Sequence, residues 1–510
     1  MLRTSGPVRA LFNNAADSRS TKTPPIRNDI SALMAGSAIW MLWSVLVVII
    51  FDNGYPFSIS ELFFLIATAG LSGTCVRLGS GFLVQNAPLA VVWFVSLLLL
   101  ILPLSLLMGA FISPSPSFWQ FQLAALSSGV GAVFLPLRTC MTDFGQSTAR
   151  IEQEARSALA DSGLIVAQVV LPVLGFLPLA GWLTTLPLEY NSSHVLGRIS
   201  AGSGFSIFAA LSVFFLLLLI AIFRALPAFL GERRKVLTIL RTLLIYTVLM
   251  GICFFLLSGV GGTGPLGNII LAGLLIVVIT LFLLLMVFSR IPRGRESGFL
   301  PMVVNRKLQL LSLLHLMGAG SMLGFSASLP LLGKEFFDLQ WAGGDIYLSN
   351  PLGSGVLTYV WLLPVVAIIT RGISAWLARY YKPERINQSA LLLMLVSVSM
   401  LTVSLEYLAD NSSYTTLFLM VLLFFIGSGL SAGSVFYQIS RAFPAASMHQ
   451  VMIWISGISS FGVFYIANMF SGQHDMQHPE FILYSFSVFY GVGMLLNWFF
   501  FLRRKSELSF

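Results

Sequence analysis

The sequence is poor in charge and in cysteine. Only 10% of its 510 residues are charged, 57% are hydrophobic, and the mean hydropathy is +0.88. A chain of this composition cannot hide its apolar surface in a water-soluble core, so a soluble globular protein is excluded. The three cysteines, Cys75, Cys140 and Cys253, lack metal-ligand spacing and are interpreted as packing residues. The composition indicates a polytopic, all-α membrane protein.

Long apolar runs supply the predicted membrane spans. A helix needs about 20 apolar residues to cross the hydrocarbon layer, and the sequence contains fourteen runs of about this length. They lie near 30–51, 62–83, 89–111, 118–137, 158–183, 204–223, 237–258, 266–289, 308–331, 353–378, 388–408, 414–439, 449–471 and 481–502.

The basic residues predict the orientation. With a cytoplasmic N-terminus, 25 of the 29 Lys and Arg residues fall at cytoplasmic ends or loops, and only Arg198 and Lys334 fall outside. An even number of spans then makes both termini cytoplasmic. The net charge of +9 therefore reflects the basic residues at the cytoplasmic ends of the spans, and nothing favours a nucleic-acid partner. We expect 1–28 to be a disordered cytoplasmic tail without a cleavable signal.

Two arginines, Arg77 and Arg371, lie deep inside apolar segments. A guanidinium at mid-bilayer costs at least about 2.5–3.5 kcal/mol, so it is expected to face a polar cavity and to need an anionic partner. That partner is either a transported anion or a fixed carboxylate, for which Asp161 is the most deeply placed candidate.

The two halves of the chain resemble each other. The fourth predicted span contains Gly131-Ala132-Val133-Phe134 and the twelfth Gly433-Ser434-Val435-Phe436. The two phenylalanines are 302 residues apart and the two deep arginines 294, so one offset roughly superimposes both features. Two homologous bundles with a site between them are typical of secondary transporters. Gly131, Gly429 and Gly433 are expected to allow close packing and sliding of helices.

Several motifs resemble the nitrate/nitrite porter family of the major facilitator superfamily. The similar stretches are Trp40-Met41-Leu42-Trp43-Ser44-Val45, Leu71-Ser72-Gly73-Thr74-Cys75-Val76-Arg77, Gly324-Phe325-Ser326-Ala327 and Gly429-Leu430-Ser431-Ala432-Gly433-Ser434-Val435-Phe436. The resemblance covers most of 36–183 and 305–503. It implies two pseudo-symmetric six-helix bundles, to which this chain adds two helices.

The resemblance also implies a binding site. Arg77 and Arg371 would hold a small planar oxyanion such as nitrate or nitrite, because a guanidinium offers a planar fork of donors. Phe134 occupies the position of the family's aromatic ring that stacks on the anion. A packed core phenylalanine is the alternative for Phe134.

The sequence departs from the family pattern at two positions. Asp161 stands where the family has an asparagine contact to the anion, and His315 and Ala319 stand where it has Tyr and Phe. Asp161 and His315 could bind and release protons, and the alternative function is therefore proton-coupled transport of a different small organic anion. Alternatively, Asp161 neutralises an arginine and His315 replaces a tyrosine hydroxyl as a donor.

These observations predict a transporter rather than an enzyme, with no cofactor or catalytic constellation. A metal site at His474 and His478 is not expected, because they lie in a short loop. The expected location is the bacterial inner membrane, with the bilayer and a small anion as partners and the oligomeric state left open. A non-transporting sensor on the same fold is a further alternative. The predicted divisions are 1–28, 29–183 (helices 1–5), 184–262 (extra pair), 263–304 (helix 6 and loop), 305–503 (second bundle) and 504–510.

Overall fold

The computed structural model describes residues 30–52, 55–86, 88–113, 116–139, 163–169, 203–230, 305–334, 360–407, 414–472 and 480–503. Throughout these ranges the regular structure is helical, without strands. Nine of the described helices are long and apolar enough to cross a membrane, and Leu211–Leu226 and Leu362–Leu377 are shorter apolar helices. The all-α membrane fold is confirmed. The count of fourteen stays a prediction, because 237–258, 266–289 and most of 158–183 lie outside the described residues.

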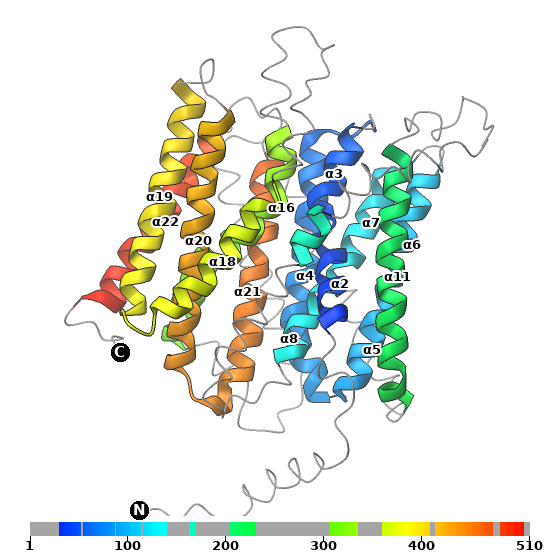
Figure 1. Ribbon diagram of the computed structural model, residues 1–510, viewed down its shortest axis with the longest axis horizontal. Coiled ribbons are helices and arrows are strands. Elements are labelled where there is room, and N and C mark those ends of the chain that lie inside the picture. Colours follow the sequence, from blue (N-terminus) through cyan, green and yellow to red (C-terminus); the bar gives the residue numbers. More distant parts are fainter. Residues whose placement is uncertain are drawn as a thin grey trace, which may run out of the picture.

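The first bundle is built from segments of the N-terminal half (Figure 1). Several of its spans are divided into two or three shorter elements. In chain order these are α2 (Ile30–Met41) with α3 (Trp43–Asp52); α4 (Ile59–Asn86); α5 (Leu89–Leu99) with α6 (Ile101–Ile112); α7 (Phe118–Ser128), the 3₁₀ segment η2 (Gly129–Val133) and α8 (Phe134–Thr139); and α11 (Ser203–Leu230). Residues 163–169 add a further helical segment.

The second bundle repeats this arrangement with the C-terminal half (Figure 1). Its first span is interrupted by a π-helical segment. The elements are α15 (Arg306–His315), the π-helix η5 (Leu316–Gly320) and α16 (Ser321–Lys334); α18 (Leu362–Leu377); α19 (Pro383–Tyr407); α20 (Tyr414–Ala442); α21 (Ala445–Ser471); and α22 (Glu480–Asn497) with the π-helix η7 (Trp498–Leu502).

The packing of α11 bears on the number of helices in each half. α11 packs against α5, α6 and α2, the third and first spans of its bundle. α22, the last span of the second bundle, packs in the same way against α19 and α15. We therefore infer that α11 is the sixth helix of the first bundle. Our prediction instead assigned 204–223 to the extra pair. The other divisions stay predictions.

α4 and α21 form the main contact between the bundles. They run antiparallel, with Phe63 stacked on Phe470 at a centroid distance of 5.4 Å and Ser460 Oγ donating to Thr74 Oγ1 at 3.3 Å. α16 also packs on α3. The terminal side is defined here as the side where α2 begins and η7 ends, and the far side as the side where α3, α16 and α21 end (Figure 1). The bundles thus meet on the far side.

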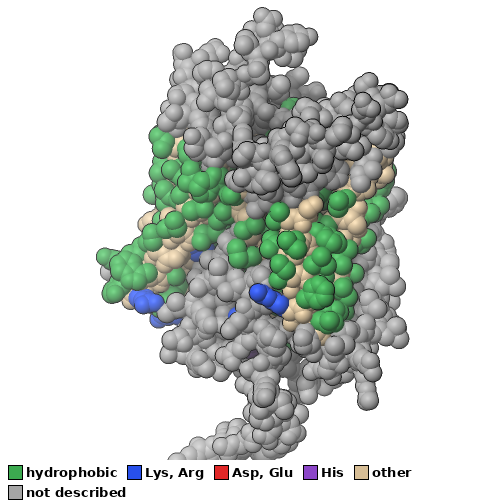
Figure 2. Space-filling model, turned by 45° about the vertical axis from the view of Figure 1, so that its right-hand side comes forward, with side chains coloured by type: hydrophobic (Ala, Val, Ile, Leu, Met, Phe, Trp, Pro, Cys, Tyr) green, Lys and Arg blue, Asp and Glu red, His purple; other side chains and the backbone are tan. Residues whose placement is uncertain are grey.

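The outer faces of the described helices are apolar. Figure 2 shows hydrophobic side chains over both visible bundles, with Lys and Arg side chains near their lower ends. The exposed side chains include Leu102, Phe223, Ile369, Val488 and Leu495. An apolar girdle of this kind suits a bilayer, which solvates hydrocarbon side chains as well as a protein core does.

Candidate functional site

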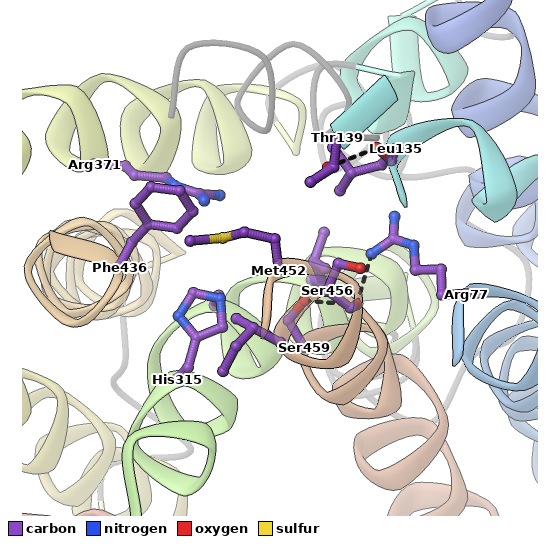
Figure 3. Close-up of a pocket in the computed structure, with 12 residues that line it drawn as sticks. Arg77, Leu135, Thr139, His315, Arg371, Phe436, Met452, Ser456 and Ser459 are labelled. Atoms are coloured by element: carbon purple, nitrogen blue, oxygen red, sulfur yellow. Dashed lines mark hydrogen bonds between the residues drawn. The ribbon is translucent and has the colours of Figure 1, made fainter. Parts of the chain in front are cut away.

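Three of the predicted site residues, Arg77, His315 and Arg371, line one pocket between the bundles (Figure 3). The pocket has about 420 Å³ of non-atom space, part of it open to the surroundings. Two of its lining residues are arginines, and none of the lining residues that the structure describes is acidic. The other lining residues are Leu135, Thr139, Ala319, Leu323, Phe436, Met452, Ile455, Ser456 and Ser459.

Arg77 is fixed by both bundles. Its side chain is 1% exposed; Nε donates to the carbonyl of Ala132 and Nη1 to the carbonyl of Ser456, each at 3.1 Å. The guanidinium carbon lies 4.6 Å from the ring centroid of Trp40. Carbonyl dipoles and a π face stabilise a cation without neutralising it. The hydrogen bonds of Arg77 therefore bridge α4, η2 and α21.

Arg371 faces inward from α18 because of the pattern of that helix. The buried residues recur three or four positions apart, from Leu363 through Ala367 to Arg371, whereas Ile369 lies on the exposed face. The guanidinium carbon lies 6.0 Å from the centroid of the Phe436 ring on α20. Arg371 and Phe436 thus form one wall of the pocket (Figure 3).

Two predicted packing glycines bring α20 against α18. A Cβ at Gly433 would overlap the carbonyl oxygen of Arg371, and a Cβ at Gly429 would overlap that of Ala367. The absence of side chains at these positions lets the backbones approach, as small residues do between membrane helices. In the first bundle, a Cβ at Gly131 would overlap the carbonyl oxygen of Gly36.

His315 ends α15, directly before the π-helix η5. Its side chain is 3% exposed, and its Nδ1 has no hydrogen-bond partner. Because an unpaired buried polar atom is costly, a pocket that holds one is suited to a polar ligand. Single π-helical turns are frequent at functional sites. Ala319, inside η5, also lines the pocket and leaves space where the resemblance implies an aromatic ring.

Phe134 is not part of the described pocket. It is fully buried, with its ring 5.1 Å from that of Trp93 in an edge-on contact, and it lies against Gly36. This placement favours the packing alternative for Phe134. The aromatic ring that does line the pocket is Phe436, from the matching motif of the second half. The internal repeat, in which Phe436 matches Phe134, could have pointed to Phe436 from the sequence alone.

The two arginines are not directly opposed in this conformation. Figure 3 shows the Met452 side chain in the middle of the pocket, between the side formed by Arg371 and Phe436 and the side formed by Arg77 and Ser456. Met452 and Ser456 were not predicted as site residues, because nothing in an apolar span distinguishes a pocket-lining methionine or serine from a packing one.

Asp161, the remaining predicted site residue, lies outside the described residues. Its proposed ion pair and its role in proton coupling therefore stay predictions. Among the residues that the structure describes, no group of three His, Cys, Asp or Glu side chains could hold a metal ion. The two predicted loop histidines, His474 and His478, are outside these ranges as well.

The chain is similar in sequence to proteins that are named as transporters. No protein-family model matches it. It is 22% identical over 502 residues to the nitrate/nitrite transporter NarU of Salmonella typhimurium, covering 94% of this chain and 91% of the relative. It is 24% identical over 200 residues to the probable nitrate/nitrite antiporter NarK2 of Thermus thermophilus, covering 39% of this chain and 42% of the relative.

Solved structures show the fold. The peptide-chain trace matches tetrameric PepTSo2 with a TM-score of 0.56, covering 93% of this chain and 95% of that one at 12% identity. It matches the partially occluded inward-open xylose transporter XylE of E. coli with a TM-score of 0.54, covering 93% and 97% at 12% identity. The fold, with a pocket between two similar bundles, is that of the major facilitator superfamily. The predicted resemblance to the nitrate/nitrite porter family is confirmed by these similar sequences, which are named as nitrate/nitrite transporters or as a probable antiporter.

Proposed function

We propose that this protein is a secondary transporter that takes up or exchanges nitrate and nitrite by alternating access, with both termini cytoplasmic. The observation that carries the proposal is the pair of buried arginines, one from each bundle, that line one pocket between the bundles. The names of the relatives support the choice of nitrate and nitrite as the anions.

Arg371 and His315 form the first part of the proposed anion site. A guanidinium donates two parallel hydrogen bonds to a planar oxyanion, and such charge-assisted bonds are roughly twice as strong as neutral ones. The unpaired Nδ1 of His315 can donate a third hydrogen bond when it carries the proton. Phe436 supplies an apolar face beside the guanidinium.

Arg77 links anion binding to movement of the bundles. Its Nη1 donates to Ser456 of the second bundle, so this bond must break or move when α4 and α21 separate. An anion that accepts from the same nitrogen would replace the Ser456 carbonyl as its partner. Anion binding would thereby remove the cost of leaving a buried guanidinium donor unpaired, and the loaded protein would change conformation more readily.

Proton-coupled transport of a different small organic anion is the second candidate function. The observation that favours it is the buried, unpaired Nδ1 of His315 inside the pocket. Asp161 is the proposed second titrating group.

One experiment tests both functions. Purified protein in liposomes loaded in turn with nitrate, nitrite, formate and a dicarboxylate is expected to show counterflow with nitrate and nitrite only, at constant luminal pH. Luminal acidification or alkalinisation in step with the anion, abolished by Asp161→Asn, would establish the proton-coupled alternative. Counterflow with the dicarboxylate but not with nitrate or nitrite would contradict the proposed substrate class, and no flux at all would favour a sensor.

The two phenylalanines of the repeat are expected to respond differently to truncation. Phe134→Ala should lower the free energy of unfolding by about 3–5 kcal/mol, because it empties a packed site beside Trp93, and should leave the apparent affinity for nitrate unchanged. Phe436→Ala should instead weaken the affinity with a smaller loss of stability. Melting curves and nitrate titrations of both purified variants check this. Weaker nitrate binding by Phe134→Ala would contradict the packing assignment.

A further inference from the structure

One apolar side chain reaches across the pocket between the two arginines. Met452, on α21, is 4% exposed and lines the pocket. Figure 3 shows its side chain pointing away from α21, with the sulfur and the terminal methyl group directed toward Arg371 and Phe436. Met452 therefore occupies space that an anion bound to Arg371 would enter.

The residues of α21 explain why Met452 reaches farther than its neighbours. Met452, Ser456 and Ser459 recur four and three positions apart, so they lie on one face of the helix, and all three line the pocket. Both hydroxyls donate to carbonyls of their own helix, Ser456 Oγ to Ile453 at 2.9 Å and Ser459 Oγ to Ser456 at 3.0 Å. These short side chains stay against α21, whereas Met452 is long and has three rotatable bonds.

The arginines alone do not explain a preference for nitrate and nitrite. A guanidinium binds a carboxylate with the same planar fork of donors, so small carboxylates compete for such a site. The feature that excludes them has to lie beside the guanidinium, where a carboxylate would place its carbon substituent. Met452 lies there. Its thioether is only a weak hydrogen-bond acceptor, so it fills space without replacing an oxyanion as the partner of Arg371.

We propose that Met452 determines the size of the anion that the pocket accepts. This inference rests on the proposed function and deepens it. A small oxyanion needs only the space next to the guanidinium, which the flexible side chain vacates by rotating. An anion with a carbon substituent also needs the middle of the pocket, where Met452 stays tethered to α21. Met452 is thus a specificity-determining residue that excludes substituted carboxylates.

Acetate is the probe for this inference, because it presents two oxygens as nitrite does and adds one methyl group. Nitrate counterflow in liposomes is measured at rising concentrations of acetate or nitrite, and the ratio of the two inhibition constants is determined. Met452→Ala should lower the acetate-to-nitrite ratio by about tenfold or more, because one extra carbon in an apolar pocket changes discrimination by about 10- to 200-fold. Met452→Val should lower it by a smaller factor, and this variant provides the same test if the alanine variant does not fold.

Met452→Leu and Met448→Ala are the matched controls. Leucine conserves the volume of methionine, so Met452→Leu should keep the wild-type ratio. Met448 lies one helical turn before Met452, is 1% exposed and does not line the described pocket, so Met448→Ala makes the same truncation elsewhere in α21 and should also keep the ratio.

Three results would overturn the inference while leaving the proposed function intact. They are equal inhibition of wild-type nitrate exchange by acetate and nitrite, an unchanged ratio in Met452→Ala and Met452→Val, and the same fall in Met448→Ala as in Met452→Ala. A wild type that exchanged neither nitrate nor nitrite would instead overturn the proposed function, and the inference with it.

Discussion

Replacing Arg371 with lysine is expected to weaken nitrate binding by roughly 10- to 100-fold and to abolish exchange at low substrate concentration. Lysine keeps the positive charge but loses the planar fork, so one of two hydrogen bonds to the anion is lost, and a bond to a charged group contributes about 1.5–3 kcal/mol. The melting temperature should stay near that of the wild type. Exchange and nitrate titrations of the purified variant measure both effects.

Arg77→Lys should also abolish exchange but with a clear loss of stability. This substitution removes the bonds to Ala132 and Ser456 and the contact with Trp40, in addition to contacts with the anion. Arg441→Lys is the matched control, because Arg441 lies in the last turn of α20 with an exposed side chain. Wild-type exchange by Arg371→Lys or Arg77→Lys would disprove the two-arginine site.

The arginines could be predicted from the sequence because the argument depends only on transfer energy. A guanidinium in an apolar span must find polar surroundings whatever the details of packing. The helical fold could be inferred from composition and run length in the same way. Neither inference needed the direction of any one side chain.

The sequence could not show which way the side chain of Phe134 points, and the reason is geometric. Residues 129–133, just before it, form the 3₁₀ segment η2, whereas the matching residues before Phe436 belong to the α-helix α20. A 3₁₀ helix turns about 120° per residue and an α-helix about 100°, so five 3₁₀ residues rotate the next helical segment by roughly 100° relative to a continuous α-helix. Two nearly identical motifs therefore aim their phenylalanines differently. The π-helix η5 after His315 likewise rotates the side chains that follow it, relative to a continuous α-helix.

The contact between α4 and α21 leads to the second large prediction, which concerns Gly70. A Cβ at Gly70 would lie 2.5 Å from the backbone nitrogen of Phe464 and 2.8 Å from the carbonyl carbon of Val463. Backbone atoms cannot rotate away as a flexible side chain can, so even Gly70→Ala must push α4 and α21 apart. Overpacking of this kind costs about 1–3 kcal/mol.

Gly70→Ala should therefore disfavour the conformation closed on the far side by about 5- to 150-fold, the population change equivalent to that energy. Alternating access requires both conformations, so exchange should fall by a similar factor. Nitrate binding to the purified variant should persist, because the substitution does not touch Arg77, His315 or Arg371, and its persistence would show that the variant is folded.

Gly109→Ala provides the control for Gly70→Ala, because a Cβ at Gly109 meets nothing within 4 Å. It should exchange nitrate at the wild-type rate. A Gly70→Ala variant that binds and exchanges nitrate like the wild type would show that the bundles do not need to meet at this contact during transport. Loss of exchange with binding retained would instead assign Gly70 to the movement between conformations, because a residue that only supports the anion site would change binding first.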